Sequence, residues 1–245
     1  MPPLLIITAD RRGSRRSEID AVPEMLADLS DVTPTVLPFM RTVGDELQGV
    51  LDATSAVTAG ALFTALDHLG AGEDWWIGIG IGPGRLGADA TSSAGPAFYA
   101  ARAAVELAKA GDLTGAVAIR VGVPEDQAEL RNAFDHASRV ELQDALPYVA
   151  ALGPRAVDQW SAYEMARVAL GRHLELLRGR SPEGRAAIAL ARLGHTREQI
   201  GRELGVTRQA VDKRLAAAGW PRAEHESRHL LGLAVLRLAT ALEPA

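Results

Sequence analysis

Short, uninterrupted apolar runs mark the first half of the chain, and each has the length of a buried strand. These runs lie at residues 4–9, 75–81 and 116–121. Two further extended runs flank Val43-Gly44-Asp45, where the glycine favours a tight turn, so a hairpin is expected from residues 35–41 and 46–51. Helical periodicity fills the intervals, at residues 18–29, 53–69 and 95–110. This mixture of strands and helices indicates an α/β or α+β domain over residues 1–123.

From residue 124 onward the strand signal disappears and only helical periodicity remains. It covers residues 125–151, 157–177 and 182–193, and three further segments follow. Glycine and proline interrupt it at Gly153-Pro154 and again at residues 178–182. We therefore predict a helical connector at residues 124–180, suited to a dimer contact, and an all-α domain at residues 181–245.

Composition narrows the class of protein without naming a function. No apolar run approaches the roughly 20 residues of a membrane span, and the first residues lack the pattern of a signal peptide. The chain of 245 residues has no cysteine, which excludes disulfides and thiolate metal sites. We expect a cytoplasmic protein without membrane contact.

Charge is distributed unevenly along the chain. The formal net charge is −5, yet residues 178–222 hold ten basic and four acidic residues, a local charge of about +6. A basic surface on an acidic body suits binding to the phosphate backbone of DNA, because only the docking face must release counterions.

The segment from Thr196 to Ala218 has the pattern of two short helices joined by a turn. Thr196 and Thr207 are suitable N-caps, Gln199 completes a capping box, and Gly205 provides the left-handed residue that ends the first helix. The second helix would pack with Ala210, Val211 and Leu215 inward. Its polar side is suited to base edges and phosphates. The predicted DNA-binding residues are Thr196, Thr207, Arg208, Gln209, Asp212, Lys213 and Arg214.

A helical hairpin on the surface of an α-helical domain is the alternative interpretation of this segment. We favour a helix-turn-helix bound to double-stranded DNA, because the caps, the spacing of the helices, the small residue Ala210 between them and the basic surface occur together. The segment resembles the helix-turn-helix of sigma-factor region 4 and of LuxR-type regulators.

A second group of polar residues follows the N-terminal strands. Asp10 ends the first strand, and Asp45 lies at the hairpin tip behind Gly44. Two such carboxylates side by side would form a magnesium site. The loop with Gly13 and Ser14 would offer backbone amides to a polyphosphate, and Arg102 would contact its outer oxygens. In a purely structural interpretation Asp10 ends a strand, Asp45 forms a turn, and Arg102 pairs with one of them.

Four segments in order resemble the SatD family and, more distantly, class III nucleotide cyclases and GGDEF diguanylate cyclases. They are Ala9-Asp10 with Gly13-Ser14, Gly44-Asp45-Glu46 with Gln48-Gly49, the strand IGIGIG, and Gly95-Pro96-Ala97-Phe98 through Arg102. The resemblance implies an α+β fold: a ferredoxin-like, nucleotide-cyclase-type domain followed by an all-α helix-turn-helix domain. It implies that Asp10 and Asp45 bind Mg²⁺ with a nucleotide.

The resemblance carries the cyclase catalytic set only in part. Arg102 matches the transition-state arginine, and the base-selecting lysine falls at Arg41. Phe98 replaces the catalytic asparagine, and the companion aspartate falls near Thr91. A phenylalanine cannot stabilise ring closure as an amide does, so no catalytic residue is assigned.

Three hypotheses of function follow from these two groups of residues. The first is a homodimeric transcription regulator whose degenerate cyclase-like domain senses a nucleotide. In the second, this domain serves only as a dimerisation scaffold for a DNA-binding protein. The third is an active nucleotidyl cyclase that the helix-turn-helix targets or regulates. We adopt the first as the expectation.

Overall fold

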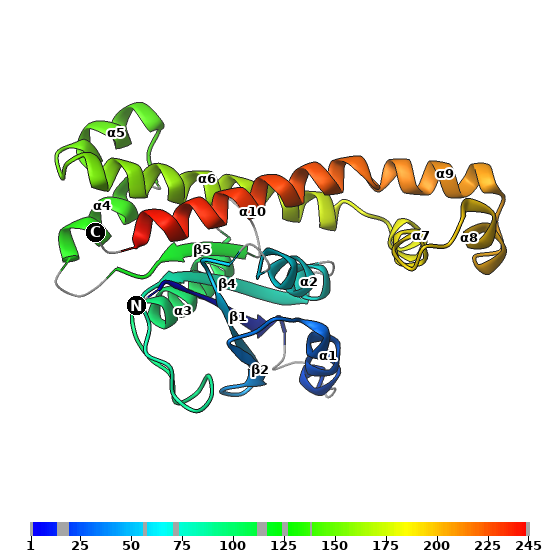
Figure 1. Ribbon diagram of the computed structural model, residues 1–245, viewed down its shortest axis with the longest axis horizontal. Coiled ribbons are helices and arrows are strands. Elements are labelled where there is room, and N and C mark those ends of the chain that lie inside the picture. Colours follow the sequence, from blue (N-terminus) through cyan, green and yellow to red (C-terminus); the bar gives the residue numbers. More distant parts are fainter. Residues whose placement is uncertain are drawn as a thin grey trace.

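The computed structural model describes residues 2–13, 20–55, 58–70, 74–111, 117–123, 127–137 and 139–243. It is an α+β structure, with a five-stranded mixed sheet in the N-terminal part and a helical C-terminal part (Figure 1). The strands are β1 (Leu4–Arg11), β2 (Leu37–Arg41), β3 (Glu46–Asp52), β4 (Trp75–Gly82) and β5 (Val117–Val121). The helices among them are α1 (Val22–Asp28), the 3₁₀ helix η2 (Leu29–Asp31), α2 (Thr58–Gly70) and α3 (Pro96–Lys109).

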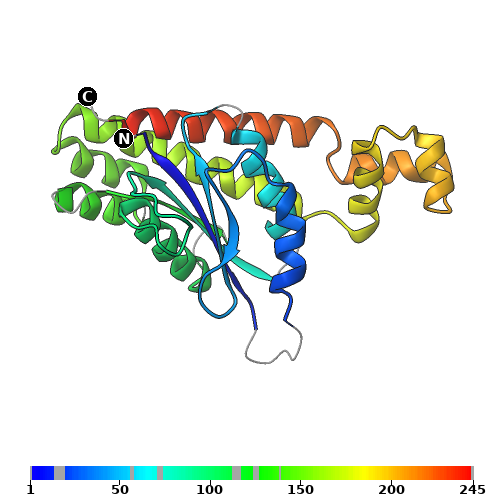
Figure 2. The same ribbon diagram turned by 60° about the horizontal axis from the view of Figure 1, so that its bottom comes forward.

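The C-terminal part contains two long helices and several short ones. In chain order they are α4 (Ala128–Ala137), α5 (Leu142–Ala150), α6 (Pro154–Arg178), α7 (Pro182–Arg192), α8 (Arg197–Glu203), α9 (Arg208–Ala217) and α10 (Arg222–Leu242). The long helices α6 and α10 lie side by side over the sheet, and α7, α8 and α9 project beyond their common end (Figures 1 and 2). No helix of the described part is long and apolar enough to cross a membrane.

The sheet has the order β2-β3-β1-β4-β5, with β1 in the centre. β1 is antiparallel to both β3 and β4, whereas β5 is parallel to β4 and is reached through α3. Helices cover both faces. Leu5 and Ile7 of β1 face the core that contains α2, α6 and α10, and Leu4 and Ile6 face α3. Burial on both faces explains why β1 is apolar at consecutive positions.

The glycines of β4 allow α3 to lie close against the sheet. A Cβ at Gly80 would lie 2.1 Å from the carbonyl oxygen of Ala97, and one at Gly78 would lie 2.2 Å from that of Ala101. Neither distance is possible for real atoms, so the strand needs glycine opposite the helix backbone. Glycines at alternate positions of a strand allow close approach of a ligand or of a neighbouring element, and at Gly78 and Gly80 the neighbour is the backbone of α3.

Several predicted helix boundaries were wrong. The periodicity at residues 125–151 suggested one helix, but α4 and α5 are separate and fold back on each other, with the rings of His136 and Tyr148 4.7 Å apart. The turn lets Phe134 and Val149 enter the same core. Two other helices begin later than expected. α1 starts at Val22, where Pro23 occupies the first turn, and α2 starts at Thr58.

We predict that Gly80→Ala lowers the free energy of unfolding by about 1–3 kcal/mol, the usual cost of overpacking, because the new methyl group meets helix backbone. The matched control is Gly60→Ala on the exposed side of α2. There the added Cβ meets no atom, and helix propensity should raise stability by up to about 1 kcal/mol. Urea denaturation measures both, and a neutral Gly80→Ala variant would contradict the packing argument.

Candidate functional site

Helices α7, α8 and α9, here called the three-helix unit, have a small core of their own. Its buried members are Ala187, Ile188, Ile200, Val211, Leu215 and Ala218. Leu204, Val206 and Trp220 pack against them from the turns. The inward position expected from the sequence is therefore confirmed for Val211 and Leu215, whereas Ala210 is only half-buried.

The caps of α8 and α9 are the ones that the sequence predicts. The Thr196 hydroxyl accepts a hydrogen bond from the amide of Gln199, whose side chain accepts one from the amide of Thr196. The hydroxyl of Thr207 accepts a hydrogen bond from the amide of Ala210 at the start of α9. Gly205 has a φ of +64°, in the left-handed region expected after α8. Side-chain caps hold the start of both helices in place.

Sequence reasoning missed Gly201, which sets how tightly the turn closes. The backbone amide of Val206 donates to the carbonyl oxygen of Gly201 over 2.8 Å. A Cβ at Gly201 would lie 2.7 Å from the carbonyl oxygen of Val206. A glycine inside a helix costs about 1 kcal/mol relative to alanine, and that penalty is the signal in the sequence of a close approach.

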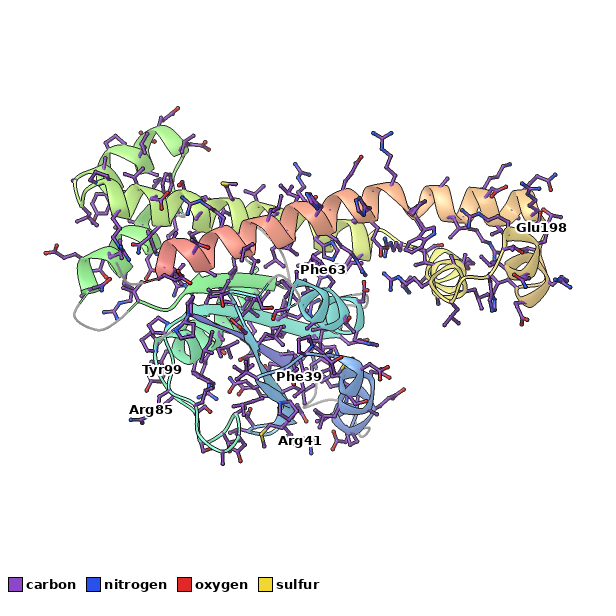
Figure 3. The ribbon with its side chains drawn as sticks, in the orientation of Figure 1. Phe39, Arg41, Phe63, Arg85, Tyr99 and Glu198 are labelled. Carbon is purple, nitrogen blue, oxygen red and sulfur yellow. The ribbon has the colours of Figure 1, made fainter. Side chains whose placement is uncertain are left out.

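The outer side of α9 presents most of the predicted DNA-binding residues. Thr207, Arg208, Gln209, Asp212 and Lys213 are exposed, and Arg214 is half-buried. Two acidic residues engage the arginines nearby. Arg208 pairs with Glu198 at 3.0 Å, and Asp212 pairs with Arg197 at 3.2 Å. Glu198 lies at the outer end of the three-helix unit (Figure 3).

Lys213 stands apart from these surface pairs. Among the described residues it takes part in no ion pair within 4.0 Å, and the same holds for Arg202 on α8. Surface pairs such as Arg208–Glu198 contribute at most about 1 kcal/mol, so a phosphate exchanges readily with the acidic partner. Lys213 and Arg202 of the three-helix unit can therefore bind an anion directly, and Arg208 can do so once the anion has replaced Glu198.

The predicted nucleotide-site residues gather at one end of the sheet, where β1 ends and the β2–β3 hairpin turns. Asp10 lies opposite Glu46 across the β1–β3 pair, on the side that faces α3. Lys109, near the C-terminal end of α3, places its Nζ 2.7 Å from Oδ2 of Asp10. Arg102 donates to Oε1 of Glu46 over 3.1 Å. We call Asp10, Glu46, Arg102 and Lys109 the sheet-end cluster.

The hairpin tip lies next to this cluster. Gly44 forms the turn with a φ of +60°, and Gly13 follows β1 with a φ of +68°. Arg41 hydrogen-bonds Asp20 and lies 3.9 Å from Oδ1 of Asp45. The hydrogen bond from Arg41 holds the pKa of Asp20 below its usual value. Ser14, a predicted phosphate ligand, lies outside the described residues.

Sequence reasoning missed Glu46 and Lys109 as members of this site. The hairpin register contains a signal for Glu46, since the residue after Asp45 falls opposite Asp10. Partial burial disfavours the charged form of Lys109, but hydrogen bonds to Asp10 and Glu106 outweigh it, so the pKa of Lys109 is raised. Arg102 pairs with Glu46, the residue after Asp45. This is close to the purely structural interpretation, in which Arg102 pairs with one of the two aspartates. In the described ranges no group of three or more His, Asp or Glu is arranged as a metal site.

Phe98 is a core residue. It is buried between α3 and the sheet, in contact with the cluster of Leu4, Ile6 and Val50. Its ring fills space beneath α3 and faces away from the solvent side where Arg102 projects. The departure from the cyclase pattern at this position therefore has a packing role.

The most strongly buried charges lie where the three-helix unit meets the rest of the molecule. Glu224 of α10 is 3% exposed. Its carboxylate contacts Arg180 and Arg192 at 2.6 Å each, and Arg228 at 3.2 Å. Arg192 and Arg228 also pair with Asp67 of α2. These five residues are called the Glu224 network. Burial disfavours the charge of Glu224, yet the arginines outweigh it and lower its pKa.

The Glu224 network corrects the charge estimate from the sequence. Arg180 and Arg192 belong to the basic stretch of residues 178–222, but both bind carboxylates, and Arg180 is also buried. Arg180 also donates to the carbonyl oxygen of Ala218, at the end of α9. The positive charge available to a ligand is therefore smaller than the sequence suggests and is concentrated on α8 and α9.

Comparison with protein-family models, with curated proteins and with solved structures finds no match. A proposal of function therefore depends on the residues and geometry described above.

A pH dependence follows from His173 of α6, which is fully buried beside the Glu224 network. Its Nδ1 lies 3.0 Å from the hydroxyl of Ser227, and Nε2 has no hydrogen-bond partner among the described residues. Burial, with help from the charge of Arg228, lowers the pKa of His173 to about 4. The unfolded state, with an ordinary pKa near 6.5, binds the proton more readily.

We predict that the free energy of unfolding falls as pH drops from 6.5 to 4, and that His173 contributes up to about 3 kcal/mol of this loss. Chemical denaturation at several pH values measures it. His173→Gln should flatten this part of the profile, and the exposed control His136→Gln should leave it as it is. An unchanged slope in His173→Gln would assign the effect to other groups.

Proposed function

We propose that this protein is a DNA-binding transcription regulator, with α8 and α9 as its helix-turn-helix and α9 as the recognition helix. The observation that carries the proposal is the combination found in the three-helix unit. Two capped helices meet at a closely packed turn, have their own apolar core, and leave the polar side of α9 open to solvent. A recognition helix needs this rigid attachment and free outer side to enter the major groove.

The distribution of polar residues along α9 supports separate roles. Thr207, Arg208 and Gln209 stand at its N-terminal turn, the part of a recognition helix that reaches base edges. Gln209 suits bidentate contact with adenine, and Arg208 suits guanine once it leaves Glu198. Lys213 and Arg214, one turn further on, suit phosphates, as does Thr196 at the start of α8.

We further propose that the N-terminal part is a ferredoxin-like, nucleotide-cyclase-type domain of the kind found in SatD proteins. Its support is topological. The strand order β2-β3-β1-β4, with β1 antiparallel to both of its neighbours, is that of two interleaved β-α-β units. In this proposal Asp10 and Asp45 would hold Mg²⁺ with a nucleotide, whose phosphates would reach Arg102, Arg41 and the Gly13–Ser14 and Gly44 turns.

In this proposal the residues of the sheet-end cluster change their ion-pair partners when the nucleotide binds. Lys109 now neutralises Asp10 at 2.7 Å, and Arg102 neutralises Glu46. An incoming Mg²⁺–nucleotide would take Asp10 as a metal ligand and leave Lys109 for a phosphate. Lys109 and Arg102 would then pair with the phosphates, and Mg²⁺ would take the place of Lys109 beside Asp10.

A homodimer is part of the proposal, because two-fold dimers match palindromic operators. Large apolar side chains stay exposed on the helices that lead to the three-helix unit. They include Met165 and Val168 on α6 and Leu230 and Leu233 on α10, each at least half-exposed. These residues stand at helical spacing on the two long helices.

The second candidate function is a DNA-binding protein whose N-terminal domain is only a scaffold for dimerisation. The pairing within the sheet-end cluster favours it, because Asp10 and Arg102 already have protein partners. An active nucleotidyl cyclase is disfavoured by the buried Phe98.

We predict that Lys213→Ala weakens binding to all DNA sequences alike and reduces the slope of log affinity against log salt by about 1. Gln209→Ala should instead relax specificity at one base pair. Fluorescence anisotropy with DNA from upstream of the protein's own gene measures both, the slope over a series of salt concentrations and the specificity at one fixed concentration. The matched control is Arg172→Gln, an exposed arginine of α6 outside the unit. If Lys213→Ala behaves like this control, α9 is not the docking helix.

We predict that one nucleoside triphosphate with Mg²⁺ shifts DNA affinity, and that DNA shifts nucleotide affinity by the same factor. Asp45→Asn should abolish the shift while leaving nucleotide-free DNA binding intact. In the scaffold alternative no nucleotide has an effect, and Asp10→Asn and Asp45→Asn change nothing. A cyclic product that disappears in Asp45→Asn would instead establish the cyclase.

A further inference from the structure

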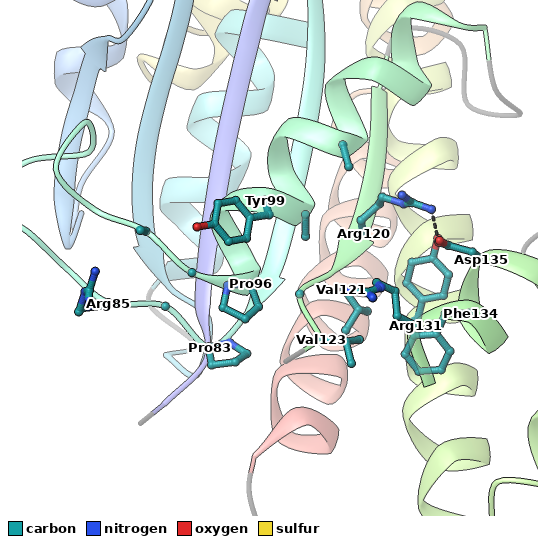
Figure 4. Close-up of a pocket in the computed structure, with 17 residues that line it drawn as sticks. Pro83, Arg85, Pro96, Tyr99, Arg120, Val121, Val123, Arg131, Phe134 and Asp135 are labelled. Atoms are coloured by element: carbon teal, nitrogen blue, oxygen red, sulfur yellow. Dashed lines mark hydrogen bonds and ion pairs between the residues drawn. The ribbon is translucent and has the colours of Figure 1, made fainter. Parts of the chain in front are cut away.

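A cavity of about 600 Å³ lies at the opposite end of α3 from the sheet-end cluster. It opens where the parallel strands β4 and β5 end and α3 begins, and α4 closes its other side (Figure 4). Crevices at the carboxyl ends of parallel strands are a common place for ligands, and the volume suits a small organic molecule. The cavity is lined by none of the residues of the sheet-end cluster, so the two are distinct sites, although Ala103 of the lining is next to Arg102 along α3.

The lining of the cavity includes apolar residues and several aromatic ones. Val123 and Phe134 are buried, and Phe134 stacks on Tyr163 with ring centroids 5.9 Å apart and an interplanar angle of 14°. Tyr99 of α3, a residue that is 63% exposed, stands across from Phe134 (Figure 4). A flat, apolar ligand body would fit between these two aromatic walls.

The charged residues of the cavity leave an excess of positive charge. Arg120 and Asp135 form an ion pair with each other. Arg85 and Arg131 also line the cavity, and neither has an ion-pair partner among the described residues. A planar guanidinium binds a carboxylate or phosphate through two parallel hydrogen bonds.

The backbone at the start of α3 does not compete for this role. The amide of Ala97 donates to the carbonyl oxygen of Pro83 over 3.0 Å, and the amides of Phe98 and Tyr99 donate to that of Gly95. Recognition of an anion here therefore falls to the arginine side chains.

We propose that this cavity binds a small organic anion, with its apolar body between Tyr99 and Phe134 and a carboxylate or phosphate at Arg131, which lies beside Phe134, whereas Arg85 lies on the far side of Tyr99 (Figure 4). No metal is needed, because the arginines supply the countercharge. This binding site is independent of the proposed nucleotide site at Asp10 and Asp45 and of DNA binding.

The test is isothermal titration calorimetry of the full chain with benzoate and phenyl phosphate, in the presence of EDTA and without DNA. The two probes distinguish a carboxylate from a phosphate head, and benzyl alcohol is the uncharged control. We expect saturable binding of at least one anion and none of benzyl alcohol. Arg131→Gln should weaken it by about tenfold or more, the worth of one charge-assisted hydrogen bond.

Two more variants make the outcome decisive. Ala103 is half-buried in the lining, so Ala103→Phe should fill the cavity and abolish binding. The surface variant Arg172→Gln should bind like the native chain. Thermal unfolding checks that each variant folds, and if Ala103→Phe does not fold, the charge reversal Arg131→Glu takes its place. Absence of saturable binding of either anion, or equal affinity in Arg131→Gln or Arg131→Glu, would overturn the proposal.

Discussion

The carboxylate of Glu224 is surrounded by three guanidinium groups in a place that solvent hardly reaches. A charge in such a position is tolerated only when its partners are all present, and removal of one partner from a buried pair commonly costs 3–5 kcal/mol. The partners come from different parts of the chain: Arg180 precedes α7, Arg192 ends it, and Arg228 lies on α10. Asp67 extends the same network to α2, beside the sheet. This set of ion pairs therefore helps to fix the position of the three-helix unit relative to the sheet.

This constraint limits how the protein can be regulated. The three-helix unit has its own core, and the Glu224 network joins it to α2 and the long helices. A ligand that repositions the unit must break or exchange ion pairs in the network, which gives two discrete arrangements instead of a continuous bend. His173 packs against the same region, with its ring 5.7 Å from that of Phe63 on α2. A proton on His173 would add positive charge where arginine is already in excess.

Helix α3 connects the two candidate ligand sites of the N-terminal part. Arg102 in its middle and Lys109 at its C-terminal end neutralise the carboxylates at the sheet end. Its N-terminal end, held by hydrogen bonds to Pro83 and Gly95, forms one wall of the cavity. Gly78 and Gly80 keep the helix against the sheet, so neither end can move without the other. Close packing on the glycine positions of β4 makes α3 a rigid support for both sites.

Local interactions explain what the sequence by itself determined. The apolar runs of the strands, the glycine of the hairpin and the threonine caps of α8 and α9 depend on neighbours within a few residues, and all of them are found in the structure. Pairings between distant residues were decided by the tertiary structure. Asp10 meets Lys109 only because α3 crosses the sheet, and Arg180 and Arg192 have carboxylate partners only because Glu224 and Asp67 come from other helices. A sequence records the charge of each residue, but the sign of the charge beside it is set by the fold.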